Sequence, residues 1–124
     1  MDLPKNERTF QFSYKSELFN KMFEGSFTVK CVLNMLDKRI LEIEKSRLRL
    51  DVINPTPDLI ALTTIQANLK TRIIEAPEWW KQSNNGNDIQ DEGVIVTLFD
   101  KVMDQEDEWR AELKAKSEGT DKGN

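Results

Sequence analysis

The chain has 124 residues, 38% of them hydrophobic. This length is enough for one domain with a buried core and too short for two domains. It contains no histidine, so the commonest general base, the usual nitrogen ligand of zinc and the Ser/His and Cys/His nucleophile pairs are excluded. The formal charge is −4, and acids interrupt the densest run of bases, from Lys30 to Arg49, which argues against the continuous basic surface that nucleic acids need. We therefore expect a protein that is not an enzyme and has no cofactor, no metal site, no small-molecule substrate and no nucleic-acid partner.

The compartment is predicted from the N-terminus, the hydropathy and the cysteine count. No apolar run follows a basic N-terminal stretch, and no apolar segment approaches the about 20 residues that a bilayer span requires. Cys31 is the only cysteine, so it cannot form an intrachain disulfide and is expected to be a small apolar residue in a strand. The prediction is a cytosolic protein without a membrane partner.

Two alternating runs near the N-terminus predict a β-hairpin. Phe10, Phe12 and Tyr14 share one face of residues 9–15, and residues 23–31 alternate in the same way. The connecting residues 16–22 are too many for a two-residue turn, and three of them are unusually apolar for a loop: Leu18, Phe19 and Met22. This segment is expected either to form a short helical turn or to present an apolar tip to a partner.

Two helices are predicted next. Asn34 is a suitable N-cap for a helix from about Met35 to Leu50, whose charged residues are expected on a solvent-exposed face. The apolar positions that recur at helical spacing are Leu36, Ile40, Ile43 and Leu50, with Leu33, Leu41 and Leu48 beside them. A second helix is predicted to begin with Thr56 as cap and Pro57 at its first position, and to end near Glu75, before Pro77.

The adjacent residues Trp79 and Trp80 follow that helix break. In an extended segment neighbouring side chains face opposite ways, so one tryptophan is expected in the core and the other partly exposed. A partly exposed tryptophan beside an apolar surface is typical of a protein-binding hot spot. The alternative, in which both rings are buried against helices, remains open at this point.

A third helix is expected to begin at Asp88 or Asp91 and to run to about Lys116. Its apolar positions are Ile95, Leu98, Phe99, Val102, Trp109 and Leu113. Four acids within five residues cannot all face one pocket, so a solvated acidic face is predicted for Asp104, Glu106, Asp107 and Glu108.

The resulting class is α+β: an N-terminal antiparallel β-hairpin packed on three α-helices, in a single domain over residues 10–116. Residues 1–9 precede the first aromatic side chain and are predicted to be a flexible N-terminal arm. Residues 117–124 have no apolar residue to bury and are predicted to be a disordered C-terminal tail.

The order of these features resembles small proteins of the tail-morphogenesis regions of tailed bacteriophages, which are often described as tail assembly chaperones. The resemblance covers roughly residues 23–113. It is carried by Phe27-Thr28-Val29-Lys30, by Glu44-Lys45-Ser46-Arg47-Leu48, by the block Glu75-Ala76-Pro77-Glu78-Trp79-Trp80, and by Leu98-Phe99-Asp100-Lys101-Val102 with Glu106-Asp107-Glu108-Trp109-Arg110.

The resemblance implies a non-enzymatic role in which the chain binds a tape-measure or other tail protein during assembly in the host cytoplasm. Exposure arguments select the protein-binding residues: Leu18, Phe19, Met22, Trp79 and Trp80. One alternative is a minor structural protein retained in the virion as a tail, connector or capsid accessory subunit. Another is an anti-defence factor that binds a host protein, with the acidic residues 88–108 mimicking nucleic acid. Homo-oligomerisation is left open.

Overall fold

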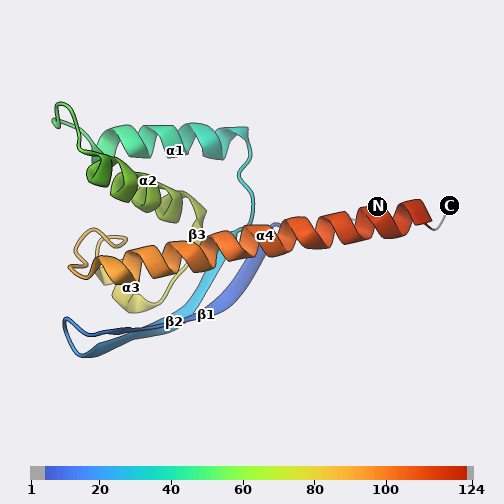
Figure 1. Ribbon diagram of the computed structural model, residues 1–124, viewed down its shortest axis with the longest axis horizontal. Coiled ribbons are helices and arrows are strands. Elements are labelled where there is room, and N and C mark those ends of the chain that lie inside the picture. The colour runs from blue at the N-terminus through green and yellow to red at the C-terminus, as the bar shows by residue number, and fades with distance from the viewer. Residues whose placement is uncertain (1–4, 123–124) are drawn as a thin grey trace.

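A three-stranded antiparallel sheet and four helices form the fold, so the α+β class is confirmed (Figure 1). The computed structural model describes residues 5–122, and the side chains as far as Glu118. Along the chain the elements are β1 (Glu7–Ser16), β2 (Lys21–Lys30), α1 (Met35–Leu48), α2 (Pro57–Arg72), β3 (Ile73–Glu75), α3 (Glu78–Gln82) and α4 (Glu92–Lys122). The sequence predicted the hairpin and three of the helices, and it missed β3 and α3.

The predicted hairpin forms with the expected alternation. Phe10 pairs with Phe27 and Tyr14 with Phe23 across β1 and β2, and a four-residue turn over residues 17–20 joins the strands. Met22 therefore belongs to β2, whereas the sequence placed it in the connecting segment. The turn is shorter than predicted because the strands continue to pair beyond the last aromatic residues, as far as Ser16 and Lys21.

The third strand corrects the predicted end of the second helix. The sequence extended that helix to Glu75, but α2 ends at Arg72 and residues 73–75 pair antiparallel with β2, through Val29 with Ile73 and Thr28 with Glu75. Two adjacent β-branched isoleucines before Pro77 favour the extended backbone, and the edge of β2 that β1 leaves free provides hydrogen-bonding partners.

The core lies between one face of the sheet and the helices. α4 runs across the sheet, and the α1–α2 hairpin stands on the other side of α4 (Figure 1). The buried cluster is formed by Phe12, Phe27, Val29, Leu69, Trp80, Val94, Ile95, Leu98 and Val102. These residues come from β1, β2, α2, α3 and α4. Neither α1 nor β3 contributes to the cluster, although Ile73 of β3 packs against it.

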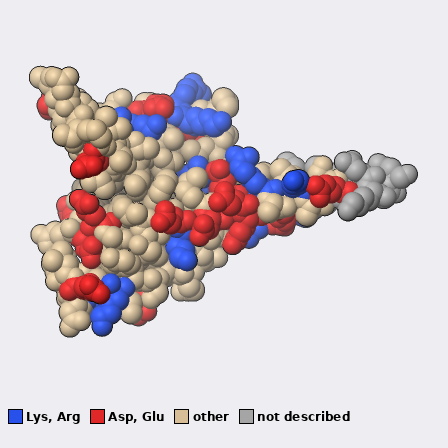
Figure 2. Space-filling model, viewed as in Figure 1, with Lys and Arg blue, Asp and Glu red and all other residues tan. Residues whose placement is uncertain are grey.

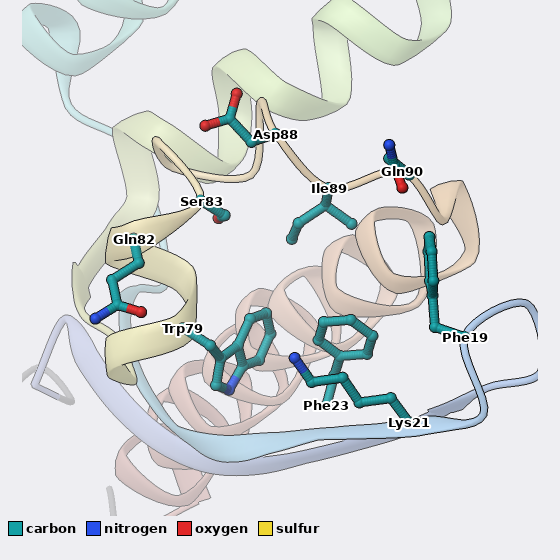
Figure 3. Close-up of a pocket in the computed structure, with 9 residues that line it drawn as sticks. All are labelled: Phe19, Lys21, Phe23, Trp79, Gln82, Ser83, Asp88, Ile89 and Gln90. Atoms are coloured by element: carbon teal, nitrogen blue, oxygen red, sulfur yellow. The ribbon is translucent and has the colours of Figure 1, made fainter.

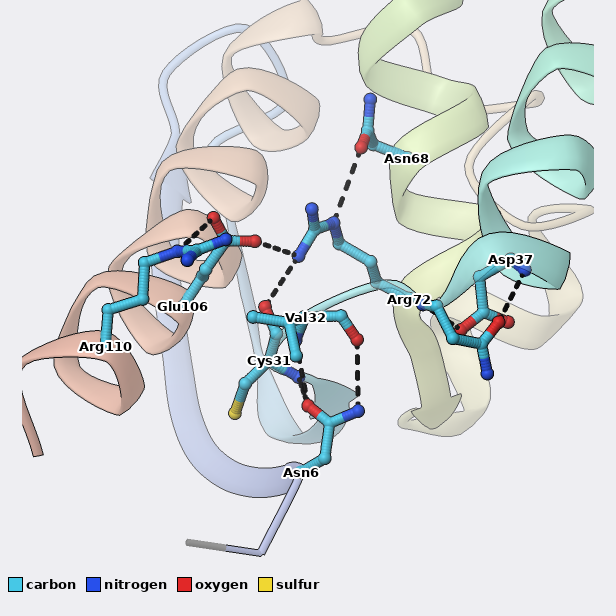
Figure 4. A network of polar contacts seen from close by, with 9 residues as sticks. Asn6, Cys31, Val32, Asp37, Asn68, Arg72, Glu106 and Arg110 are labelled. Atoms are coloured by element: carbon cyan, nitrogen blue, oxygen red, sulfur yellow. Dashed lines mark hydrogen bonds and ion pairs between the residues drawn. The ribbon is translucent and has the colours of Figure 1, made fainter. Parts of the chain in front are cut away.

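A buried polar network ties three of these elements together beside the core (Figure 4). Nη1 of Arg72 donates to the carbonyl oxygen of Cys31 at 2.9 Å and to Oε1 of Glu106 at 3.0 Å. Arg110 reaches the same carboxylate from the solvent side at 3.1 Å. Among the described residues every buried side-chain nitrogen and oxygen has a hydrogen-bond partner, so this network is complete.

The helix starts were predicted correctly from their caps. Asn34 accepts a hydrogen bond from the backbone N–H of Asp37, whose side chain in turn accepts from the backbone N–H of Asn34. Thr56 accepts from the N–H of Leu59, with Pro57 at the first helical position. Both motifs satisfy amides that the helix itself leaves unpaired.

The orientation of α1 differs in part from the prediction that its charges face solvent: Lys38, Arg39, Glu42 and Arg47 are exposed as expected, but two acids are not. Asp37 and Glu44 are buried, and their carboxylates pair with Lys30 at 2.8 Å and with Lys70 at 3.0 Å. Glu44 also accepts from Arg47 at 2.8 Å. The apolar stripe of the same helix faces solvent instead, because the cations that complete the buried ion pairs stand on β2 and α2.

These ion pairs predict an acid-dependent stability. Hydrogen bonds from Lys30 and Arg47 lower the pKa values of Asp37 and Glu44 respectively. The unfolded carboxyl groups have pKa values of about 3.9 and 4.3, so in acid the unfolded chain binds more protons than the folded one. The stabilisation is therefore present above these values and is lost as the pH falls through the lowered, folded values.

We expect the Asp37→Asn/Glu44→Gln double variant to show a weaker dependence of its free energy of unfolding on pH than the wild-type protein. Urea denaturation from about pH 6 to about pH 2 measures this difference, since the pH dependence reports the difference in bound protons between the two states. Parallel curves for the two proteins would show that the pairs contribute nothing to acid sensitivity.

Both predicted end segments contain regular secondary structure. Residues 7–9 of the predicted flexible arm belong to β1, where Arg8 forms ion pairs with Glu108 and Glu112 of α4. Residues 117–122 of the predicted disordered tail continue α4, and pairs one turn apart such as Lys114 with Glu118 support it there. Residues 1–4 and 123–124 of these predicted segments lie outside the described residues.

Candidate protein-binding site

A pocket of about 380 Å³ lies between the tip of the hairpin and α3 (Figure 3). The turn, β2, α3 and the loop between α3 and α4 all contribute to its lining. The lining residues are Phe19, Lys21, Phe23, Trp79, Gln82, Ser83, Asp88, Ile89 and Gln90. Two of the predicted binding residues, Phe19 and Trp79, therefore meet in one pocket although 60 positions separate them in the chain.

Aromatic packing fixes the wall that Trp79 forms. Its ring lies 5.2 Å from the ring of Phe23 and 5.8 Å from that of Phe27, both edge to face. Its Nε1 donates to the backbone carbonyl of Glu24 at 2.8 Å. The indole is thus held against β2 by edge-to-face ring contacts and by a hydrogen bond, with part of its surface left for a ligand.

The short helix α3 explains the different positions of the two tryptophans. Trp80 is 1% exposed and belongs to the core, whereas Trp79 is partly exposed. This is one of the two arrangements that the sequence left open, and the sequence did not indicate which ring would be exposed. The geometric reason given for it was wrong. The two residues lie in a helix and not in an extended segment, so their side chains point about 100° apart around its axis and not to opposite faces.

The tip of the hairpin is apolar and exposed. Leu18, Phe19 and Met22 are 68%, 46% and 47% exposed. Phe19 lines the pocket, whereas Leu18 and Met22 do not. Asn20 adopts a positive φ of 49° within the turn, a conformation that asparagine tolerates better than most residues.

The turn is anchored to the start of α4. The hydroxyl of Ser16 is buried, donates to Oδ2 of Asp91 at 2.6 Å and accepts from the N–H of Phe19 at 3.3 Å. The position of Phe19 relative to the α3–α4 loop is therefore set by hydrogen bonds as well as by the strands. Both walls of the pocket, the one formed by Trp79 and the one formed by the turn with Phe19, are therefore held in place by contacts within the protein.

Two opposite charges accompany the apolar lining. Lys21 and Asp88 contribute one cation and one carboxylate, and the ammonium of Lys21 lies 5.1 Å from the centre of the Phe23 ring. Figure 3 shows Lys21 extended beside this ring. Such a pocket can hold a large apolar side chain while its polar groups bind the adjoining peptide backbone.

The acidic residues of the C-terminal half are spread along α4 and not gathered at the pocket. Asp100, Asp104, Asp107 and Glu108 are exposed, and Figure 2 shows acidic side chains along this helix. Glu106 is an exception to the predicted acidic face, because it turns inward to Arg72. Within residues 5–122 no group of three His, Cys, Asp or Glu side chains is arranged to hold a metal ion.

Cys31 is fully buried, as expected of a small apolar residue, but it lies directly after β2 and not in a strand as predicted. Burial raises the pKa of its thiol, although Arg8 and Arg72 partly oppose the effect. A buried, protonated thiol is a poor nucleophile.

Several lining residues were missed by sequence reasoning. Phe23 was assigned only to a strand, and Lys21 and Ile89 carried no local signal of a binding role. An isoleucine within a polar loop, such as Ile89 between Asp88 and Gln90, is the feature that points to a loop folded back on an apolar surface.

Comparisons of the chain with known protein families, with curated proteins and with solved structures find no match. None of the helices in the described part of the chain combines the length and the apolarity that a membrane span requires.

Proposed function

We propose that the chain is a non-enzymatic bacteriophage morphogenesis protein, a tail assembly chaperone that binds a tape-measure or other tail protein through the pocket between Phe19 and Trp79. The observation that carries the proposal is the combination of a preformed aromatic pocket with an exposed apolar turn beside it. The phage setting comes from the sequence resemblance, and the binding role from the pocket.

The chemistry of the pocket suits reversible binding of an apolar chain segment. Its volume is near the lower end of ligand pockets, which span about 300–1,000 Å³, so it fits one or two large side chains and not a folded domain. Burying one Leu or Phe side chain stabilises a complex by about 1.5–3 kcal/mol. A contact of this size holds a client during assembly and still permits its release.

We expect Phe19→Asp to reduce the amount of client that the protein keeps soluble when it is co-expressed with the tape-measure protein of the same phage. The substitution places a carboxylate where an apolar client side chain would cover it. Removing this unpaired charge from water is unfavourable. Phe19 is already 46% exposed, so the fold should tolerate the change. The soluble client fraction and the recovered complex are the measured quantities.

Ile60→Asp is the matched control, because Ile60 is 41% exposed on α2 and does not line the pocket. This variant should keep the client as soluble as the wild-type protein does. Equal loss in both variants would exclude the pocket as the binding site, and an insoluble client even with the wild-type protein would refute the chaperone role. Mass spectrometry of purified particles separates the alternative, since a virion subunit would be present in stoichiometric amounts.

A further inference from the structure

A second pocket, of about 420 Å³, is lined by α1, by the residue Leu33 before it, by the end of α2 and by α4. It shares no lining residue with the pocket that holds Phe19 and Trp79. Its lining brings together three cations, two carboxylates and two leucines, and the proposed function uses none of them. We call it the Arg72 pocket, after the most deeply buried of the cations.

Arg72 has hydrogen-bonding capacity that the fold does not use. Its side chain is 7% exposed. Nε donates to Asn68 at 3.4 Å, and Nη1 donates to both Cys31 and Glu106 (Figure 4). Nη2 donates to no atom of the described residues, yet it is in contact with solvent, since every fully buried side-chain nitrogen among them has a partner. A guanidinium that is otherwise buried therefore offers the N–H groups of Nη2 to the pocket.

Lys38 adds a second unpaired cation to the lining. Its side chain is exposed and forms neither an ion pair nor a hydrogen bond with the described residues. The two carboxylates of the lining, in contrast, are already paired. Glu106 lies between two arginines, and Glu42 accepts from Lys45 at 3.2 Å. The charge that the fold leaves uncompensated at this pocket is therefore positive.

We propose that the Arg72 pocket binds a single carboxylate that is attached to an aliphatic group. The carboxylate would accept hydrogen bonds from Nη2 of Arg72 and from the ammonium of Lys38, the two donor types that bind carboxylates most strongly in proteins. Leu33 and Leu41, which are half-buried in the lining, would contact the aliphatic group. The volume lies within the range of ligand pockets, about 300–1,000 Å³.

Glu42 and Glu106 disfavour an anion of higher charge. A phosphate monoester carries about −1.5 to −2 charges at neutral pH, so both carboxylates would repel it more strongly than they repel one carboxylate. The two leucines in turn disfavour an anion without an apolar part. A branched aliphatic acid and the C-terminus of a peptide that ends in leucine share the required chemistry, and the experiment distinguishes these two sources.

Isothermal titration calorimetry with the full chain tests the proposal. The probes are isocaproate, its neutral amide, the peptide acetyl-Gly-Gly-Leu with a free carboxylate, and the same peptide with an amidated C-terminus. At least one acid should bind about tenfold more tightly than its amide, because a hydrogen bond to a charged group contributes at least that much. This affinity should fall as the salt concentration rises. Binding by isocaproate identifies a small acid as the ligand, and binding by the peptide alone identifies a chain terminus.

Lys38→Ala should weaken the bound acid about fivefold, the upper range for an exposed ion pair. Lys101→Ala is the matched control, because Lys101 is also an exposed lysine but does not line the pocket. Methyl NMR spectra locate the ligand: the signals of Leu33 and Leu41 should shift, and that of Ile89 in the other pocket should not. Circular dichroism checks that both variants are folded.

Three outcomes would overturn the proposal. The first is that the acids bind no more tightly than their amides. The second is an equal loss of affinity in Lys38→Ala and Lys101→Ala, which would reduce the effect to the overall charge of the protein. The third is displacement of the acid by an equal concentration of inorganic phosphate, which would show that the pocket does not select a carboxylate. Phe19→Asp should leave acid binding unchanged, so failure of client binding at Phe19 and failure at the Arg72 pocket are observed separately.

Discussion

Replacing Arg72 with methionine is expected to lower the free energy of unfolding by about 3–5 kcal/mol, the cost of removing one partner from a buried ion pair. The side chains of Arg72 and Glu106 are 7% and 16% exposed. Without Arg72, the Glu106 carboxylate would lose its buried ion-pair partner at a position where little water can replace that interaction. The carbonyl of Cys31 would lose its donor as well. Urea denaturation at neutral pH measures the change.

The same carboxylate supplies the control. Arg110 also pairs with Glu106, but its side chain is 62% exposed, and an exposed pair contributes about 0–1 kcal/mol. Arg110→Met should therefore cost far less than Arg72→Met. Equal losses would mean that the buried position of Arg72 has no special importance, and that the network of Figure 4 is only a set of surface contacts.

The local elements of this fold were readable from sequence because local rules determine them. Alternation predicted the two long strands, and the caps at Asn34 and Thr56 predicted the starts of α1 and α2. The short strand β3 was not readable, because its residues become a strand only when the edge of β2 is beside them. The orientation of α1 was hidden for a similar reason: the cations that draw Asp37 and Glu44 inward include Lys70, 26 residues beyond Glu44.

The candidate site was predictable in part. An apolar turn and a pair of tryptophans are unusual enough to be noticed in a sequence. Because of them, Phe19 and Trp79 were among the residues predicted to bind a protein. The same reasoning could not separate Phe19 from Leu18 and Met22, which stand beside the pocket without lining it. Which of these residues meets Trp79 depends on the register of the hairpin and on the buried Ser16 to Asp91 hydrogen bond.

Replacing Trp80 with alanine is expected to cost about 3–5 kcal/mol of the free energy of unfolding, the range for truncating a buried aromatic side chain. The ring is 1% exposed and lies 5.9 Å from Phe27 and 6.2 Å from Trp79, edge to face in both cases. Because Trp80 supports the wall of the pocket, client binding should fall as well. Urea denaturation and the soluble client fraction report the two effects separately.

Gly86 shows how tightly this ring is enclosed. Its φ is +89°, and a Cβ built there would lie 2.5 Å from Cη2 of Trp80. Gly86→Ala should therefore destabilise the protein for two reasons, backbone strain and a clash with the ring. Trp80→Phe removes the part of the indole that the new methyl group would meet, but leaves the backbone strain in place. Trp80→Phe/Gly86→Ala should consequently lose less stability than the sum of the two single variants, and strict additivity in this cycle would show that the ring does not pack on the loop that forms the pocket rim.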